Sequence, residues 1–227
     1  MISFDFNSYT IKTPGYLRCT LPEEVVKEVK KTMKKIDNDK IKTEDNRKNL
    51  AGHLQKETTF PITKKLKYVV ESLCYEYDSI FLNKIRNKYN HSTEFVKELS
   101  EDDYEFKYIL RSAWINYSKK HDFNPIHMHT GHYSFVLWVK IPYKLEDEDK
   151  MYPCSNGNKS GRFYFVHSEA NMPITSVTST LVDAVEWDLI LFPASLNHTV
   201  YPFFSTDEER ISISGNLYYE PVKVKKK

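Results

Sequence analysis

The first half of the chain carries apolar residues at helical spacing. After Glu23, residues Val25, Val29 and Met33 recur every four positions among lysines and acids, which predicts an amphipathic helix. The segment Thr20-Leu21-Pro22-Glu23 has the form of a capping box, so we expect the helix to begin there. A second helix is predicted from residue 63 into the mid-80s. Its expected buried stripe is Leu66, Val69, Val70, Leu73, Tyr77, Ile80 and Phe81.

The second half changes to the pattern of strands. Seven segments are rich in β-branched and aromatic residues, and polar, Pro-bearing or Gly-bearing turns separate them. They are residues 105–117, 133–141, 161–167, 174–185, 188–192, 198–203 and 210–219. This spacing predicts an antiparallel sandwich or barrel, with the earlier helices covering one outer face. Residues 144–150, with Asn156-Gly157 beyond them, are interpreted as a charged loop.

These patterns predict an α+β, mostly β fold in three parts. Residues 1–104 are expected to be mainly helical and to pack on the barrel, which spans residues 105–220. Residues 221–227 form a basic tail. Because no Ser-rich or Pro-rich linker separates the parts, we expect a single structural unit.

Composition narrows the class of protein. The chain has 227 residues, of which 40% are hydrophobic and 28% charged, which is typical of a globular domain. The net charge of +2 gives no indication of a nucleic-acid-binding surface. No signal peptide or membrane span is predicted, and three widely spaced cysteines fit neither a zinc site nor a disulfide framework. We therefore expect a cytoplasmic protein, whose oligomeric state the sequence leaves open.

The segment NPIHMHTGH, residues 124–132, contains three of the chain's eight histidines. His127 and His129 are two positions apart, so on extended backbone their imidazoles point to one face and could chelate one metal ion. His132 is out of this alternation, on the opposite face or in the turn. The pair alone is a modest signal, since two such histidines also occur by chance.

Two later motifs strengthen the case for a site. In LFPASLNHTVYP, His198 opens a strand, and in RISISGN, Arg210 and Ser212 share one strand face with Ser214 and Asn216. An arginine directed into a barrel is costly unless it meets an anion, and an arginine with a serine two residues on suits a carboxylate. Pairing of Arg210 with a surface acid, such as Glu208 or Glu209, is the alternative, but it does not explain the alternating serines.

Taken together, these motifs resemble the 2-oxoglutarate/Fe(II)-dependent oxygenases. The likeness is to small stand-alone members with His-x-His, including ones encoded by bacteriophages. It rests on Trp114-Ile-Asn116, Asn124-Pro-Ile-His127-Met-His129, Ser134-Phe-Val136, Phe192-Pro193, His198-Thr-Val200-Tyr-Pro202 and Arg210-Ile-Ser212, with NLAGHLQKE at residues 49–57. The resemblance covers roughly residues 49–218.

The resemblance implies a double-stranded β-helix, that is, a jelly-roll or cupin-like barrel with a metal in one mouth. His127 and His198 would bind Fe(II), and Arg210, assisted by Ser212, would hold the distal carboxylate of 2-oxoglutarate. Asn116 would hydrogen-bond this cosubstrate. The implied activity is that of a dioxygenase that uses O2, hydroxylates an unidentified substrate and releases succinate and CO2, in the cytoplasm of a phage-infected host cell.

The third metal ligand departs from the family pattern. The superfamily uses His-x-Asp or His-x-Glu, whereas here His129 follows His127. We interpret His129 as the third ligand, with His132 or an acid such as Asp122 as alternatives. Trp114, Ser134 and His132 are further candidates for the pocket wall.

Two other functions fit parts of the pattern. A metal-binding cupin-like barrel that does not use 2-oxoglutarate, either an isomerase or a binding module, would also use His-x-His and a later histidine. Cupins usually add a glutamate and glycine-rich turns, which this chain lacks, and they need no Arg210. A structural barrel, such as a phage-particle component, is the third interpretation. The sequence does not indicate whether the substrate is a small molecule or a macromolecule.

Overall fold

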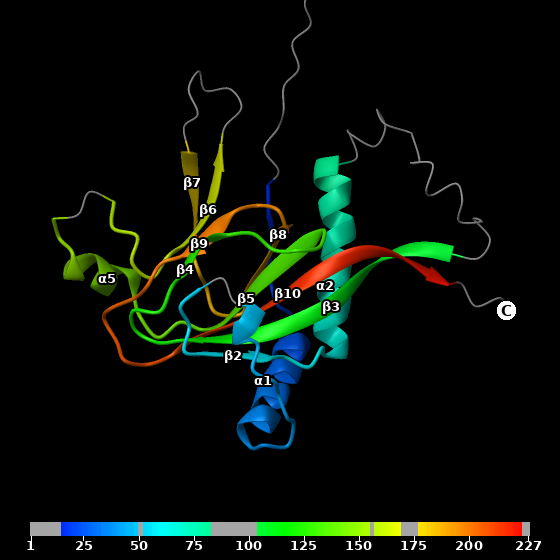
Figure 1. The fold of residues 1–227 in the computed structure, drawn as a ribbon, viewed down its shortest axis with the longest axis horizontal. Helices are drawn as coiled ribbons and strands as arrows, with labels where there is room; N and C mark the ends of the chain where they lie inside the picture. The colour runs from blue at the N-terminus through cyan, green and yellow to red at the C-terminus, as the bar shows by residue number, and fades with distance from the viewer. Residues whose placement is uncertain (1–14, 50–51, 83–103, 155–156, 169–176, 224–227) are drawn as a thin grey trace, which may run out of the picture.

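Two antiparallel sheets form the centre of the computed structural model (Figure 1). The structure describes residues 15–49, 52–82, 104–154, 157–168 and 177–223. The larger sheet has six strands in the order β1-β8-β5-β10-β3-β2, and the smaller has four in the order β4-β9-β6-β7. Strands of the larger sheet are β1 (Leu17–Thr20), β2 (Lys56–Thr59), β3 (Tyr104–Ser118), β5 (Tyr133–Lys140), β8 (Asp188–Pro193) and β10 (Arg210–Lys223). Those of the smaller are β4 (Asn124–His127), β6 (Phe163–Ser168), β7 (Val177–Val182) and β9 (His198–Val200).

The larger sheet is covered on its outer face by α1 (Glu23–Asp37) and α2 (Lys64–Tyr77), as the sequence predicted (Figure 1). Val25 and Val29 of α1, with Leu66 and Val70 of α2, are buried in one core with the apolar residues of this face. Burying such a side chain fully contributes roughly 1.5–3 kcal/mol, so packing on the sheet holds both helices in place. The helices therefore leave the inner face of the sheet free to form the site.

Alternation along β5 separates two cores. Phe135 and Leu137 point to the helices, whereas Val136 and Trp138 point to the smaller sheet. The second core lies between the sheets and includes Phe163, Phe165, Val182, Ile190 and Phe192. It fills one part of the space between the sheets, and the remaining part is a cavity.

Several sequence-based boundaries were wrong in the helical regions. Thr20 does not cap α1, because it lies in β1 and its hydroxyl donates a hydrogen bond to Asp188 at 2.7 Å. The second helix gives way after Tyr77 to the π-helical segment η2 (Asp78–Leu82), where Ile80 is 60% exposed instead of buried. The remaining part of the predicted second helix lies outside the described residues.

The expected charged loop at residues 144–150 is a helix, α5 (Leu145–Met151). Glu148 is fully buried there, and its carboxylate accepts hydrogen bonds from the backbone N–H groups of Phe204 and Ser205 and from the Ser205 hydroxyl. These tertiary contacts stabilise a short, highly charged helix that the local pattern did not predict.

The boundaries of the three predicted parts of the chain also differ from those in the structure. The first 104 residues contribute β1 and β2 to the larger sheet, with a short 3-10 helix η1 (Arg47–Asn49) between α1 and β2. The predicted tail begins as strand, since β10 pairs with β3 as far as Lys223. No helix within the described part of the chain is long and apolar enough to cross a membrane.

Candidate active site

A cavity of about 890 Å³ opens between the two sheets. Strands β2, β3 and β10 of the larger sheet line one side, and residues of β4 and β9 line the other. The residues predicted from sequence that line it are Trp114, Asn116, His127, His129, His198, Arg210 and Ser212. The histidines and the RISISGN strand, which are far apart in sequence, therefore face one space.

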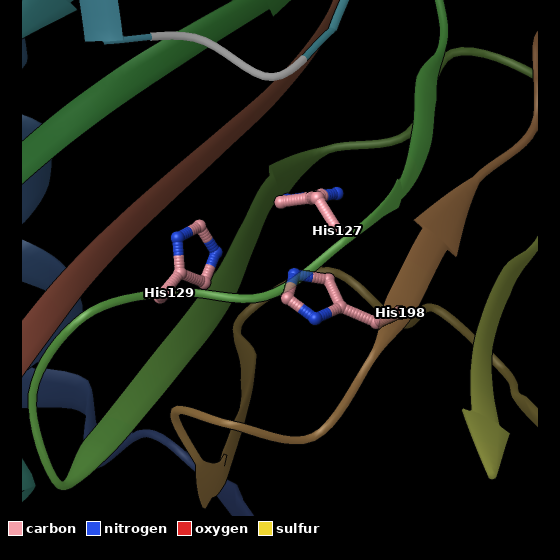
Figure 2. Close-up of side chains that lie close together, drawn as sticks. All are labelled: His127, His129 and His198. Atoms are coloured by element: carbon pink, nitrogen blue, oxygen red, sulfur yellow. The ribbon is translucent and has the colours of Figure 1, made fainter.

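Three imidazoles converge in this cavity. His127 ends β4 and is the cross-strand partner of His198 on β9, while His129 lies in the segment just after β4 (Figure 2). The ring centroids of His127 and His198 are 4.2 Å apart. The ring centroid of His129 lies 5.0 Å from that of His127 and 4.9 Å from that of His198. One ligand nitrogen from each lies within 4.8 Å of the others, and no other Asp, Glu, Cys or His in the described ranges joins the group.

Backbone carbonyls fix the orientation of two of these rings. His127 Nδ1 lies 2.8 Å from the Pro125 carbonyl oxygen, and His198 Nδ1 lies 3.0 Å from that of Leu196. A carbonyl can only accept a hydrogen bond, so each Nδ1 carries the proton and each Nε2 keeps its lone pair. Such a hydrogen bond on the far nitrogen is the usual way a metal-binding histidine is oriented.

Burial keeps the three rings neutral near pH 7. Desolvation lowers the pKa of His127, and it lowers the pKa of His129 to about 4 with help from the neighbouring His127. His198 is 2% exposed, and desolvation, followed by the charges of the other two histidines, lowers its pKa well below the usual value. Three neutral imidazoles with available lone pairs are a donor set that fits a divalent transition metal ion.

The loop after β4 holds His129 in place through its backbone. The His129 N–H donates to the Ala194 carbonyl at 2.8 Å, and the Ala194 N–H donates to the His132 carbonyl at 3.0 Å. Gly131 turns the chain with φ of 101°, and a Cβ there would lie 2.8 Å from the Leu217 carbonyl oxygen. A larger residue at this position would strain the loop that carries His129.

The two alternative third ligands lie elsewhere. His132 is exposed, does not line the cavity, and its Nδ1 accepts a hydrogen bond from the Tyr219 N–H at 3.1 Å. Asp122 is buried in a turn, where its carboxylate accepts from the Lys119 N–H at 2.9 Å. Neither is part of the histidine group.

Arg210 brings a buried positive charge to the same cavity. It is only 5% exposed, and its Nη1 donates to the Tyr143 hydroxyl at 3.1 Å and to the Tyr201 carbonyl at 3.3 Å. No carboxylate pairs with it among the described residues, and Glu208, an alternative partner, pairs instead with Lys140 at 2.6 Å. A buried guanidinium without a counter-ion favours binding of an anion beside it.

Comparison with known proteins agrees with this geometry. Residues 112–216 match the model of a family described as "Putative 2OG-Fe(II) oxygenase". That segment contains all three histidines of the group and Arg210. This segment, a little under half of the chain, is similar to the 2OG-Fe(II) oxygenases. The family match and the histidine group indicate an oxidoreductase whose cofactors are Fe(II) and 2-oxoglutarate, and they favour it over the alternative of a cupin-like protein that does not use 2-oxoglutarate.

A solved structure shows the same fold. The chain is similar to a Pseudomonas putida prolyl-4-hydroxylase, with a TM-score of 0.53, 12% identity and coverage of 92% of this chain and 94% of the other. It also matches HygX from Streptomyces hygroscopicus with nickel, 2-oxoglutarate and hygromycin B bound, with a TM-score of 0.44, 12% identity and coverage of 91% and 83%. At such low identity the first likeness establishes the fold alone, a double-stranded β-helix. No curated protein matches the sequence.

Of the remaining residues predicted for the site, Asn116, Ser212 and Trp114 line the cavity, whereas Ser134 does not. Asn116 and Ser212 are cross-strand partners, and the Asn116 amide nitrogen lies 3.5 Å from the Ser212 hydroxyl oxygen. The Trp114 ring lies 5.5 Å from that of His129, so it walls the cavity beside the three histidines. Ser134 does not line the cavity, because it is buried and donates to the Asn216 side-chain oxygen at 2.7 Å.

Sequence reasoning assigned no role to Glu57, which also lines the cavity of the oxygenase. It lies on β2, opposite Asn116 in β3, and is 2% exposed. Its Oε1 accepts a hydrogen bond from Asn46 at 2.6 Å, while its buried Oε2 has no partner in the described part of the chain. Desolvation raises the pKa of Glu57 to about 7, the nearby Asp45 adds to the rise, and Asn46 opposes it. The alternation of KETT could have pointed Glu57 inward, but nothing local marked this short polar segment as a strand.

Glu57→Gln is expected to stabilise the protein at pH 8 but not at pH 4.5. The raised pKa means that the folded state holds the Glu57 proton more tightly than the unfolded state, so wild type loses stability as pH rises from about 4.5 through 7. The amide escapes this loss, and we expect a gain of about 1–2 kcal/mol at pH 8. Urea unfolding of both proteins across this pH range measures it, with exposed Glu208→Gln as the control. Parallel pH curves for wild type and Glu57→Gln would contradict the assignment.

Proposed function

We propose that His127, His129 and His198 together bind Fe(II), and that Arg210 binds the distal carboxylate of 2-oxoglutarate. In this arrangement the protein hydroxylates a substrate at an unactivated C–H bond. The observation that carries the proposal is the presence, in a single cavity, of three neutral, converging imidazoles and one buried guanidinium that pairs with no carboxylate of the described residues.

Imidazole is a suitable ligand for iron, and three protein ligands would leave room on the metal for cosubstrate and O2. Bound Fe(II) with 2-oxoglutarate supplies the oxidising chemistry, in which O2 is consumed, one oxygen atom enters the substrate, and 2-oxoglutarate becomes succinate and CO2. The absence of a carboxylate ligand leaves a higher net positive charge on the metal site than the usual His-x-Asp set. That charge strengthens the attraction between the metal and the keto-acid end of 2-oxoglutarate.

The protein's own residues position 2-oxoglutarate. Arg210 is held by the Tyr143 hydroxyl and lies with its guanidinium carbon 5.3 Å from the centre of the Phe203 ring, so its direction is set before the ligand arrives. Ser212 follows on the same strand face and can donate its hydroxyl to the same carboxylate. The Asn116 amide, next to Ser212, can donate to the cosubstrate along its length.

Aromatic side chains around the histidines exclude water from the reacting centre. The Phe163 ring stacks on His198 with centroids 5.5 Å apart, and the Phe192 ring lies 5.0 Å from it. Phe163 and Trp114 line the cavity, so they give the side near the histidines apolar walls. Such walls protect the oxidising centre from side reactions with solvent.

Succinate formation tests the proposal without knowledge of the substrate. Purified protein supplied with Fe(II), ascorbate, 2-oxoglutarate and O2 is expected to release succinate slowly, because substrate-free turnover is a common side reaction of such a site. Omission of either Fe(II) or 2-oxoglutarate should stop it. A folded protein that forms no succinate and does not bind 2-oxoglutarate would contradict the proposed function.

We also propose a setting and an organisation for the protein. The likeness of its motif order to phage-encoded oxygenases supports action in the cytoplasm of an infected host cell. The three cysteines, Cys19, Cys74 and Cys154, are free thiols, which is consistent with a reducing compartment. The contribution of β1 and β2 to the larger sheet supports one structural unit from the helical part through the barrel.

A further inference from the structure

A row of polar side chains crosses the floor of the cavity. Glu57 on β2 is the register partner of Asn116 on β3, and Asn116 is in turn the partner of Ser212 on β10. All three line the cavity. Cross-strand partners lie side by side on one sheet face, so the row runs from the cosubstrate position at Ser212 to the edge strand at Glu57.

The Glu57 end of this row has acceptors without donors. Glu57 Oε2 and Asn116 Oδ1 are both buried and lack a hydrogen-bond partner among the described residues. The Asn116 amide can be reversed, so that its oxygen accepts from the Ser212 hydroxyl, and the buried carboxylate of Glu57 is therefore the observation that carries the inference. A buried acceptor left unpaired costs about 1–3 kcal/mol, which a bound donor would recover.

Cosubstrate cannot supply that donor. Ionised 2-oxoglutarate carries two carboxylates and a ketone, all of which only accept hydrogen bonds. It can pair with Arg210, the Ser212 hydroxyl and an amide N–H, but it has no hydrogen to offer Glu57 Oε2. The other molecule in the cavity, the substrate that is oxidised, can supply the missing donor.

The electrostatics at Glu57 favour a positively charged donor. Lys42 and Arg111 also line the cavity, but neither forms an ion pair with Glu57, and Arg111 is bound to Glu220. The other charge that affects Glu57 is Asp45, of the same sign. A desolvated carboxylate that has no cation beside it is complemented by an ammonium or guanidinium group, which supplies both a positive charge and a hydrogen-bond donor.

We propose that Glu57 recognises the substrate, with its free Oε2 accepting a hydrogen bond from an ammonium or guanidinium group held beside Asn116. This inference rests on the proposed function, because it assigns 2-oxoglutarate to the Arg210 side of the cavity. It places the cationic group at the edge of the larger sheet, away from Arg210. The substrate class is thus an amine-bearing or guanidinium-bearing molecule, whether free or as a side chain.

Binding of small probes tests this assignment. The protein is loaded with redox-inert Ni(II) and 2-oxoglutarate, and cadaverine, agmatine and the neutral analogue pentane-1,5-diol are titrated in turn by calorimetry. Wild type is expected to bind the two cations more tightly than the diol. Glu57→Gln, which keeps the size of the side chain and can still accept from Asn46, is expected to bind them roughly 10- to 100-fold more weakly.

Control variants separate charge from shape. Glu57→Asp keeps the carboxylate and should retain more cation affinity than Glu57→Gln, while Glu208→Gln, at an exposed acid outside the cavity, should bind as wild type does. The inference is overturned if wild type binds the diol as tightly as the cations, if no probe binds, or if Glu57→Gln binds the cations like wild type. A separate 2-oxoglutarate titration reports on the proposed function, so its failure is distinguishable from failure of the Glu57 assignment.

Discussion

His198→Ala is expected to abolish the release of succinate from 2-oxoglutarate, lowering the rate by at least about 100-fold. His198 is the most buried of the three histidines, and its ring is oriented by the Leu196 carbonyl and by the aromatic residues around it. A methyl group in its place supplies no lone pair, and the remaining two imidazoles form a weaker, incomplete set. His127→Ala should have the same effect, because His127 is its cross-strand partner.

His132→Ala is the matched control for these two variants. It removes a histidine from the same sequence cluster, but one that is exposed and outside the cavity. Succinate release should stay close to the wild-type rate, and circular dichroism should show that all three variants are folded. Turnover that survives His198→Ala in a folded protein, or that disappears with His132→Ala, would overturn the ligand assignment.

Arg210→Ala is expected to raise the KM for 2-oxoglutarate by roughly 30- to 1000-fold, because it removes a buried charge-assisted contact to the distal carboxylate. Arg210→Lys should recover only part of the affinity, since an ammonium lacks the planar fork of the guanidinium and cannot bond a carboxylate in the same way. Initial rates of succinate formation against 2-oxoglutarate concentration measure both effects.

Arg47→Ala is a suitable control, because Arg47 is an exposed arginine that pairs with Asp45 and does not line the cavity. Its KM should equal that of wild type. If Arg210→Ala leaves the KM unchanged while the protein stays folded, the carboxylate is held by another residue. The buried guanidinium would then need a different partner.

The residues of the proposed metal and cosubstrate sites could be selected from the sequence because their signals are local and periodic. The alternation in RISISGN placed Arg210 and Ser212 on one face, and the structure puts both in the cavity. His127 and His129 are two apart on nearly extended backbone, so their common direction also followed from spacing. That His198 lies beside them could be predicted only from the order of the motifs, because β4 and β9 pair over a long distance in the sequence.

The parts that sequence reasoning missed depend on tertiary contacts. The strand β2 is four residues long and mostly polar, and only its pairing with β3 turns Glu57 into the cavity. Likewise, α5 is a charged segment whose helix is fixed by the buried Glu148 and its contacts with Phe204 and Ser205. Neither effect leaves a periodic pattern that a single sequence reveals.

The visible absorption spectrum under anaerobic conditions tests the central claim most directly. Wild-type protein mixed with Fe(II) and 2-oxoglutarate should develop a weak visible charge-transfer band, which requires both ligands on one metal ion. The band should be absent when either component is left out, and absent in His198→Ala. A folded wild-type protein that shows no band under these conditions would contradict the assignment of iron and 2-oxoglutarate to this cavity.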